Sequence, residues 1–340
     1  MTAPLQPSTC EVSGTSFEAQ GVSFSVYTSV DEQASAFDGW DARYTQISSG
    51  PFSGSLSMVS LGGIRLLVER LDKVIFQQGA IASDRIVIGV PLELEGHARL
   101  CGERSERDSL HVFSSLPRFE FYSPDRHMLV NIEISFERMS SSQTSELAQS
   151  LRAQRLAPLL PMTSVKAENL RMLLRHALSA SASTSHAADD DAAGKERIVE
   201  RAVMYAVSEV LLAPSDAPPR AREASARHWS VVTAVNERLQ EPSTCPLSVA
   251  ELCVELDISR RTLQYAFHQA LDLNPVAYLR AVRLNHVRRE LQSGQRVTGA
   301  ATKWGFLHFG SFANDYRRMF GELPSATARR VASKHTFGSV

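Results

Sequence analysis

Two short segments near the end of the chain decide its fold: residues 247–268, which read LSVAELCVELDISRRTLQYAFH, and residues 297–317, which read VTGAATKWGFLHFGSFANDYR. Each segment has the layout of a helix-turn-helix unit, in which two short helices are joined by a tight turn. One such pattern is weakly specific because short helix pairs are common. Two patterns with matching layout in one stretch are much more specific, so we expect the last third of the chain to be all-α.

The first unit is expected to bury one face of each of its helices. Val249, Leu252, Cys253 and Leu256 are spaced at i, i+3, i+4 and i+7, which is the periodicity of one buried helical stripe. Ser259 follows as a natural N-cap, because its hydroxyl can accept a hydrogen bond from a free backbone N–H. The side chains of the second helix that should face the core are Leu263, Ala266 and Phe267.

The outer face of this second helix carries the side chains that we expect to contact DNA. Such a helix lies in the major groove with its N-terminal half near the base edges. Arginine suits guanine and glutamine suits adenine as two-bond partners, which makes Arg261 and Gln264 predicted base readers. The alternative is a solvated charged face. The whole predicted set for this unit is Ser259, Arg260, Arg261, Gln264, Tyr265 and His268, with Arg260 a phosphate contact.

The second unit is less polar on its expected reading face. Its aromatic residues Trp304, Phe306, Phe312 and Tyr316 are predicted to form its core. Glycine offers only a close approach of the backbone, while asparagine can read adenine and apolar groups can meet the thymine methyl. We therefore expect fewer base contacts and more shape or phosphate contacts here. The predicted outward residues are Phe309, Gly310, Ala313, Asn314 and Arg317.

A long helix is expected to join the two units. Asn274-Pro275 favours its start, since proline is tolerated at the first helical position. The segment up to Gln292 would be about 28 Å long at about 1.5 Å per residue, and successive major-groove faces of B-DNA are roughly 34 Å apart. One helix can therefore hold two reading helices near the spacing of one DNA turn. Arginines take the positions that its apolar stripe leaves: Arg280, Arg283, Arg288 and Arg289.

Residues 229–330 carry a set of motifs that resembles one known family. The motifs are LSVAEL at 247–252, Ile258-Ser259 followed by Leu263 and Phe267, Tyr278-Leu279 followed by Arg283-Leu284, and Trp304-Gly305-Phe306. Together they resemble the DNA-binding domain of the AraC/XylS family. The runs WGFLHFGSFANDY at 304–316 and RRTLQ at 260–264 most resemble its ethanolamine-operon regulator branch.

The resemblance implies a function and a set of partners. It implies a transcription regulator that binds double-stranded DNA in the bacterial cytoplasm, at the nucleoid, as a homodimer. It also implies an activator that recruits RNA polymerase to a catabolic operon for a small molecule such as an amine or amino alcohol. That small-molecule effector would bind the N-terminal domain.

Charge is distributed unevenly along the 340 residues. The whole chain has a formal net charge of −1, but residues 227–330 hold 14 Lys and Arg against 9 Asp and Glu, so this part is +5 and the remainder −6. A locally basic domain fits an electrostatic footprint on DNA. The sequence has no apolar run of membrane-spanning length and no secretory signal, so we expect no membrane contact. The four cysteines form no C-x-x-C pair, which favours reduced thiols over a zinc site or disulfides.

The N-terminal two thirds are expected to be β-structure followed by helices. Short apolar or alternating runs at 21–27, 65–70, 85–90 and 129–136, with turn signals between them, favour a barrel or sandwich. This part resembles, more loosely, the cupin-like effector domain of the same family. The predicted architecture is therefore α+β: a cupin-like β-barrel at 20–137, a helical dimerisation region at 138–213 (helices at 145–156, 164–180 and 195–212, a flexible loop at 181–194), a linker at 214–226 and the DNA-binding domain at 227–330.

An effector pocket is predicted inside the barrel, because small barrels can hold one small ligand. A carboxylate beside aromatic rings would suit a cationic amine through charge and cation–π attraction. The alternative is that the aromatic residues are core and the carboxylates face solvent. The predicted liners are Trp40, Tyr44, Phe52, Arg65, Glu93, Glu95 and His97.

Two other classes of protein would need residues that this sequence lacks. A metal-dependent cupin enzyme fused to a DNA-binding module would need a His-x-His pair, whereas only His97 and His111 lie near each other in the barrel segment. A methyl-accepting repair protein would need a reactive cysteine in a zinc-type cluster, which the surroundings of Cys10 and Cys101 lack. We therefore expect no catalytic residues, no metal and no cofactor.

Overall fold

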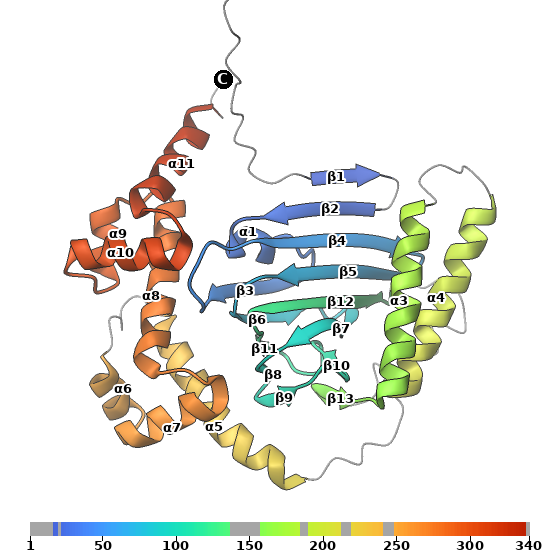
Figure 1. The fold of residues 1–340 in the computed structure, drawn as a ribbon, viewed down its shortest axis with the longest axis horizontal. Helices are drawn as coiled ribbons and strands as arrows, with labels where there is room; N and C mark the ends of the chain where they lie inside the picture. Colours follow the sequence, from blue (N-terminus) through green and yellow to red (C-terminus); the bar gives the residue numbers. More distant parts are fainter. Residues whose placement is uncertain are drawn as a thin grey trace, which may run out of the picture.

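The computed structural model describes residues 16–19, 22–136, 157–183, 190–211, 219–240 and 248–337. The N-terminal part is β-structure and the C-terminal third is helical, as Figure 1 shows. Strands occur in all four segments where the sequence predicts them. One antiparallel sheet has the strand order β1-β2-β4-β5-β12-β7-β10-β13. Its strands are β1 (Ser16–Ala19), β2 (Val22–Tyr27), β4 (Gly54–Leu61), β5 (Ile64–Leu71), β12 (Arg126–Ser135), β7 (Arg85–Glu95), β10 (Ser109–Val112) and β13 (Leu159–Pro161).

The second sheet is smaller and has the order β3-β6-β11-β8-β9. Its strands are β3 (Trp40–Gln46), β6 (Ile75–Ile81), β11 (Phe119–Tyr122), β8 (Ala98–Leu100) and β9 (Glu103–Ser105), and the short helix α1 (Val30–Ala34) precedes β3. A barrel closes only when its first and last strands pair. Here the described strands form two sheets, each with two edge strands, rather than the closed cupin-like barrel that the sequence led us to expect.

The central strand β12 shows how the layers pack. Its residues Val130, Ile132 and Ile134 are buried in the cluster that includes helical side chains, whereas Leu129 belongs to the cluster between the sheets. Asn131 and Glu133 are buried as well. Because successive side chains of a strand point to opposite faces, burial along the whole strand means that both faces of the eight-stranded sheet are covered here.

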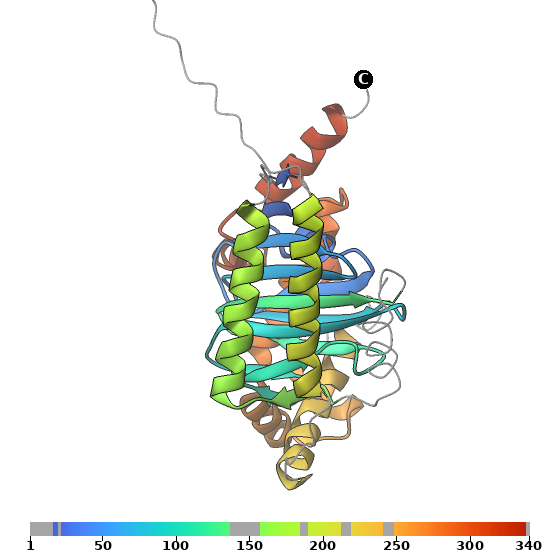
Figure 2. The same cartoon turned by 90° about the vertical axis from the view of Figure 1, so that its right-hand side faces the viewer.

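Two helices, α3 (Ser164–Ser183) and α4 (Asp190–Leu211), lie side by side across one face of the eight-stranded sheet (Figures 1 and 2). Leu170 and Leu174 of α3 and Val203 and Val207 of α4 pack against that sheet. Both helices extend into the loop expected at 181–194, while the helix expected at 145–156 lies outside the described residues. None of the described helices is both long and apolar enough to cross a membrane.

The remaining helices form the C-terminal domain on the opposite side of the sheets (Figure 1). The first, α5, begins at Pro219, inside the segment expected to be a linker, with proline at a position where the missing N–H costs nothing. The helices are α5 (Pro219–Leu239), α6 (Val249–Glu255), α7 (Arg260–Leu271), α8 (Pro275–Gln292), α9 (Val297–Lys303), α10 (Phe309–Phe320) and α11 (Pro324–Phe337).

The C-terminal domain and the five-stranded sheet share one hydrophobic core. Ile47, Phe76 and Tyr122 of the sheet region belong to the same buried cluster as the inner side chains of α5, α7, α8 and α10. The ring of Phe76 lies 5.8 Å from that of Trp229 and 6.4 Å from that of Tyr278, measured between centroids. The two parts of the chain are therefore joined by packing as well as by the linker.

Candidate nucleic-acid interface

The first helix-turn-helix unit is α6 and α7, and both helices are capped by serine. Ser248 and Glu251 form a capping box, in which the Ser248 hydroxyl accepts from the Glu251 N–H at 3.2 Å and the Glu251 carboxylate accepts from the Ser248 N–H at 2.6 Å. The predicted cap of the second helix is confirmed, since the Ser259 hydroxyl accepts from the Thr262 N–H at 3.0 Å. Asp257 in the turn has a φ of 50°, a left-handed conformation that aspartate tolerates.

The inner face of this unit matches the predicted stripe. Leu252, Leu263 and Phe267 are fully buried, and Ala266 is buried beside them. Cys253 packs against the same cluster but is only partly buried. Because the inner face of α7 is fixed in this way, its outer face is held in a defined orientation.

The outer face of α7 is open to solvent. Arg260, Arg261 and Gln264 are exposed, and Ser259 lies exposed at the helix start. Tyr265 is exposed but its ring meets that of His228 on α5, with centroids 5.1 Å apart. His268 is also exposed, and its Nδ1 lies 3.0 Å from a carboxylate oxygen of Asp272. The most polar part of the predicted set is thus accessible at the N-terminal half of the helix, where a base contact is expected.

The second unit, α9 and α10, presents a different surface. Trp304, Phe312 and Tyr316 are buried as predicted, and Phe306 is partly buried. Phe309 is 46% exposed, and Gly310, Asn314 and Arg317 are exposed, while Ala313 is partly buried. A Cβ added to Gly310 would meet nothing within 4 Å. The glycine is therefore not required by packing within the protein.

The connecting helix α8 holds one aromatic contact to each unit. Asn274 caps it by accepting from the Val276 N–H at 2.8 Å, and Pro275 is its first residue, as predicted. The ring of Tyr278 meets that of Phe267 at 5.2 Å in the first unit. The ring of His286 is stacked on Trp304 of the second unit at 3.9 Å. Burial lowers the pKa of His286 to about 3, so this imidazole is neutral near pH 7.

The four arginines of α8 divide into two pairs. Arg280 and Arg283 line a groove of about 410 Å³ between the two units, together with Ser248, His308 and Ser311. Arg280 is ion-paired with Asp315 at 3.5 Å. Arg288 and Arg289, by contrast, are turned toward the N-terminal part: Arg288 is 4% exposed, stacks over Phe320 of α10 and donates to the Thr28 carbonyl at 3.5 Å, and Arg289 donates to Asp31 at 2.7 Å. Helical periodicity alone did not separate these pairs.

The two units lie at opposite ends of α8, on the side of the helix away from the sheets (Figure 1). Residues 252–330 match the family model described as a helix-turn-helix domain. The chain is 33% identical over 105 residues to the "probable thc operon regulatory protein" of Rhodococcus erythropolis, which is 30% of this chain and 32% of that protein. It is 38% identical over 90 residues to the "XylDLEGF operon transcriptional activator 1" of Pseudomonas putida, which is 25% of this chain and 26% of that protein.

A solved structure is also similar to part of the chain. It is a "probable AraC family transcriptional regulator from Rhodopseudomonas palustris CGA009", at 36% identity and a TM-score of 0.28, and the match covers 30% of this chain and 97% of that one. Residues 252–330 are therefore a helix-turn-helix domain that is similar to those of transcription regulators. The chain spans about a third or less of the lengths of the two curated relatives named above.

The C-terminal domain is fixed to the N-terminal sheets by paired polar contacts. Asn285 on α8 and Gln46 at the end of β3 bond each other twice: the Gln46 N–H donates to the Asn285 side-chain oxygen at 3.1 Å, and the Asn285 amide donates to the Gln46 carbonyl at 2.8 Å. The Gln46 side chain also donates to the Met319 carbonyl at 3.0 Å. Both side chains are buried, so these hydrogen bonds fix how the two domains are aligned.

The predicted effector residues do not gather around one cavity. Trp40, Tyr44 and Phe52 are buried in the core between the sheets. The Trp40 indole donates to Glu133 at 3.3 Å, and the Tyr44 hydroxyl donates to Glu69 at 2.8 Å. Burial raises the pKa of Glu69 to about 7.

The remaining members of that predicted set lie outside the core. Arg65 is ion-paired with Glu133. Glu93 and Glu95 are exposed, and Glu93 pairs with Arg70 at 3.2 Å. His97 faces the C-terminal domain, where its Nε2 lies 3.1 Å from the Ala270 carbonyl.

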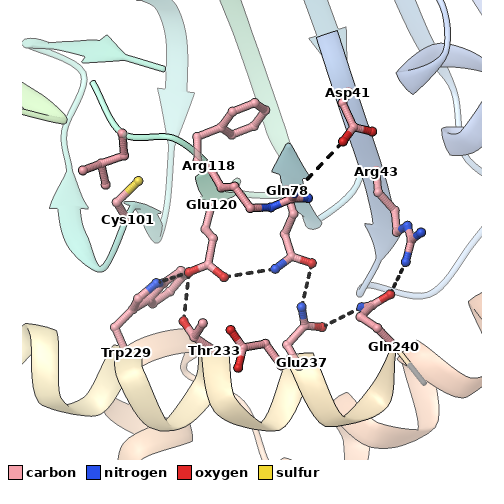
Figure 3. Close-up of a pocket in the computed structure, with 13 residues that line it drawn as sticks. Asp41, Arg43, Gln78, Cys101, Arg118, Glu120, Trp229, Thr233, Glu237 and Gln240 are labelled. Carbon is pink, nitrogen blue, oxygen red and sulfur yellow. Dashed lines mark hydrogen bonds and ion pairs between the residues drawn. The ribbon is translucent and has the colours of Figure 1, made fainter. Parts of the chain in front are cut away.

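A pocket of about 540 Å³ lies elsewhere, between the five-stranded sheet and α5 of the C-terminal domain (Figure 3). A chain of hydrogen bonds crosses it. The Glu120 carboxylate accepts from the Trp229 indole at 2.6 Å, from the Thr233 hydroxyl at 2.9 Å and from the Gln78 amide at 3.0 Å. Gln78 accepts in turn from Asn236 at 2.6 Å. Sequence reasoning missed this pocket because its walls come from segments more than 100 residues apart.

The histidines weighed for a metal site have other partners. His111 is buried, its Nε2 lies 2.5 Å from the Ser105 hydroxyl, and burial lowers its pKa to about 3. Among the residues that the structure describes, no group of three or more His, Cys, Asp or Glu is placed to hold a metal ion.

Proposed function

We propose that this chain is a sequence-specific DNA-binding transcription regulator. One observation carries the proposal: two helix-turn-helix units are held at the two ends of one helix, and the outer faces of both second helices are free while the domain is docked on the sheets. In the first unit Arg261 and Gln264 read bases, and in the second unit Asn314 reads a base while Arg317 holds phosphate. The groove with Arg280 and Arg283 would face the DNA backbone between the two major-groove contacts.

The test is selection of bound duplexes from a random DNA pool by the full chain. We expect an enriched motif with two conserved blocks about one DNA turn apart, because α8 sets the spacing of the reading helices. Affinity for the selected duplex is then measured against a shuffled duplex at fixed salt, since phosphate contacts make all affinities salt-dependent. Equal affinity for both duplexes would exclude sequence-specific binding.

The proposal extends to activation and to control by a small molecule. The relatives from Pseudomonas putida are named transcriptional activators, and activation through RNA polymerase in the bacterial cytoplasm is the role proposed for this chain. The N-terminal sheets are docked directly on the C-terminal domain, so an effector bound there can change that domain. It does so only if it binds two arrangements of the domains unequally. A reporter gene behind the selected duplex would show activation as increased transcription and repression as its loss.

Homodimerisation is proposed through α3 and α4. Their inner faces cover the eight-stranded sheet, but Val165 and Met172 on α3 and Ile198 and Tyr205 on α4 are exposed large apolar side chains. Each pair is seven residues apart, which places both members on one helical face. Sedimentation of the full chain should show a dimer that Ile198→Lys weakens and Val254→Lys on α6 does not. A monomer in the unsubstituted protein would exclude the proposal.

A further inference from the structure

We propose that the pocket between β3, β6, β11 and α5 is the effector site, and that it takes a small organic carboxylate with an aromatic or short aliphatic body. The inference rests on the proposed function, because it assigns the site through which that regulator is controlled. It moves the effector from the interior of the N-terminal sheets to their contact with the DNA-binding domain.

The pocket is built from both domains. Its floor is the face of α5 that meets the N-terminal sheets, with Trp229, Thr233 and Asn236. Its roof is formed by side chains of the five-stranded sheet and of the loop before β11 (Figure 3). Trp229 and Asn236 are buried, and Asn236 also accepts a hydrogen bond from Tyr278 of α8 at 3.1 Å. A ligand here touches both domains at once, which the filled core around Trp40 and Tyr44 does not allow.

Two arginines favour an anionic group. Arg43 projects from β3 into the pocket and donates a hydrogen bond to the neutral side-chain carbonyl of Gln240 on α5. Its pKa is lowered, first by burial and then by the charge of Arg289. Arg118 lies on the same side, 3.9 Å from Asp41, and its side chain is 68% exposed, so Arg43 is the more buried of the two arginines. A guanidinium presents parallel N–H donors that match a carboxylate.

The acidic residues of the pocket are less suited to hold a cation. Both Glu120 oxygens already accept hydrogen bonds from Trp229, Thr233 and Gln78. Asp41 is highly exposed and already near Arg118, and Glu237 lies on an exposed part of α5. An ammonium group would therefore have to compete with these donors or bind in water, where ion pairs are weak.

The rest of the lining suits an apolar body. Leu116, Phe119 and the Trp229 ring contribute apolar surface beside the arginines. Cys101 adds a thiol whose pKa burial raises to about 11, so it is uncharged near pH 7. Ligand pockets commonly combine such apolar surface with a few charged groups that fix orientation.

The floor of the pocket connects directly to the first reading helix. Trp229, Val232 and Val235 of α5 belong to the same core cluster as Leu263 and Phe267 of α7. One residue before Trp229, the His228 ring meets Tyr265 on the outer face of α7. A carboxylate bound between the arginines of the sheet side and α5 can therefore shift α5, and with it α7.

The experiment is calorimetric titration of the full chain with benzoate, phenylacetate and butyrate, alongside benzamide and benzylamine as the neutral and cationic counterparts of benzoate. At least one carboxylate should bind, and the matched amide and amine should bind about ten-fold more weakly or not at all. Arg43→Gln and Arg118→Gln should each weaken that binding by about ten-fold or more, because a hydrogen bond to a charged group is lost. Arg70→Gln is the control, since this arginine pairs with Glu93 on the other sheet.

The same titration on the chain bound to its selected duplex tests the link to DNA. Linkage requires that the acid and the DNA change each other's affinity by the same factor. The site is overturned if no carboxylate binds, if benzylamine binds more tightly than benzoate, or if both arginine variants bind as well as Arg70→Gln. Carboxylate binding with these losses, but without a selected DNA sequence, would keep the site and exclude the regulator.

Discussion

The two reading units share one scaffold and differ in what they present. Each unit lies at one end of α8 and is anchored there by an aromatic contact, from Phe267 on α7 to Tyr278 or from Trp304 at the end of α9 to His286. The first unit exposes arginine and glutamine, which have distinct partners on base edges. The second exposes Phe309, Gly310 and a single amide, Asn314. We therefore propose that the first unit supplies most sequence discrimination and that the second mainly positions the domain.

The largest effect on stability should come from removing one buried aromatic side chain from the core of each unit. Phe267→Ala and Phe312→Ala should each lower the free energy of unfolding by about 3–5 kcal/mol, since both side chains are buried. Because both belong to one cluster, urea unfolding of the full chain followed by circular dichroism should show a single shifted transition for that domain.

Val254→Ala is the control for this pair, because the side chain is 81% exposed and its loss should change stability by less than about 0.5 kcal/mol. If Phe312→Ala instead gives two separate transitions, the two helix-turn-helix units unfold independently and α8 does not couple them.

The next effect should separate base reading from phosphate binding. Arg261→Ala should cost about 1–3 kcal/mol of specific binding and relax the preference at one position of the site. Arg317→Ala in the second unit should weaken binding to all sequences alike and reduce the salt dependence, as a phosphate contact does. Gel-shift titrations of the selected duplex and its single-base variants, at two salt concentrations, distinguish these outcomes. Uniform loss in Arg261→Ala would assign that arginine to phosphate.

Acid should weaken the contact between α8 and the second unit, but not the matching contact with the first. The pKa of His286 is lowered from 6.5 to about 3 in the folded protein, so the unfolded chain takes up its proton first as the pH falls. Its contribution to stability is therefore complete above pH 6.5 and is lost below it, by about 1.4 kcal/mol per pH unit. Tyr278, its counterpart in the first unit, has a raised pKa because of burial and does not change charge in acid.

The check is to compare wild type with His286→Phe, which keeps an aromatic ring against Trp304 but cannot be protonated. Other buried histidines, His111 and His127, also have lowered pKa values because of burial and titrate in both proteins. The difference between the two proteins should grow by about 2 kcal/mol between pH 6.5 and pH 5. Parallel stability curves would show that His286 does not report on the second unit.

The smallest effect concerns glycine on the second reading helix. Added methyl groups at Gly310 and at Gly299 would both meet nothing within 4 Å, so Gly310→Ala and Gly299→Ala should each stabilise the fold by roughly 0.5–1 kcal/mol. Only Gly310→Ala should also weaken DNA binding, if the backbone of α10 approaches the duplex closely. Unchanged DNA affinity in both variants would remove Gly310 from the interface.

The parts that local pattern governs could be predicted from sequence. The cap at Ser259, the helix start at Asn274-Pro275 and the buried stripe around Phe267 follow from short-range rules, and all three are confirmed. The division of the α8 arginines could not be predicted, because it depends on which face meets the five-stranded sheet. The open pair of sheets and the pocket beneath Glu120 likewise depend on contacts between distant segments. The DNA-contact residues remain a prediction, with their exposure now described.

The two hydrogen bonds between Gln46 and Asn285 have a consequence for how such proteins can be recombined. A chimera that joins this DNA-binding domain to a different sensory domain would remove both Gln46 hydrogen bonds from Asn285, leave its amide only the bond to the Ala281 carbonyl, and expose apolar surface of α5 and α8. Both changes destabilise the protein, since an intramolecular hydrogen bond contributes about 0.5–1.5 kcal/mol and apolar surface returns to water. New specificity in this architecture should therefore be sought by matched changes on the two sides of the contact, and not by exchange of whole domains.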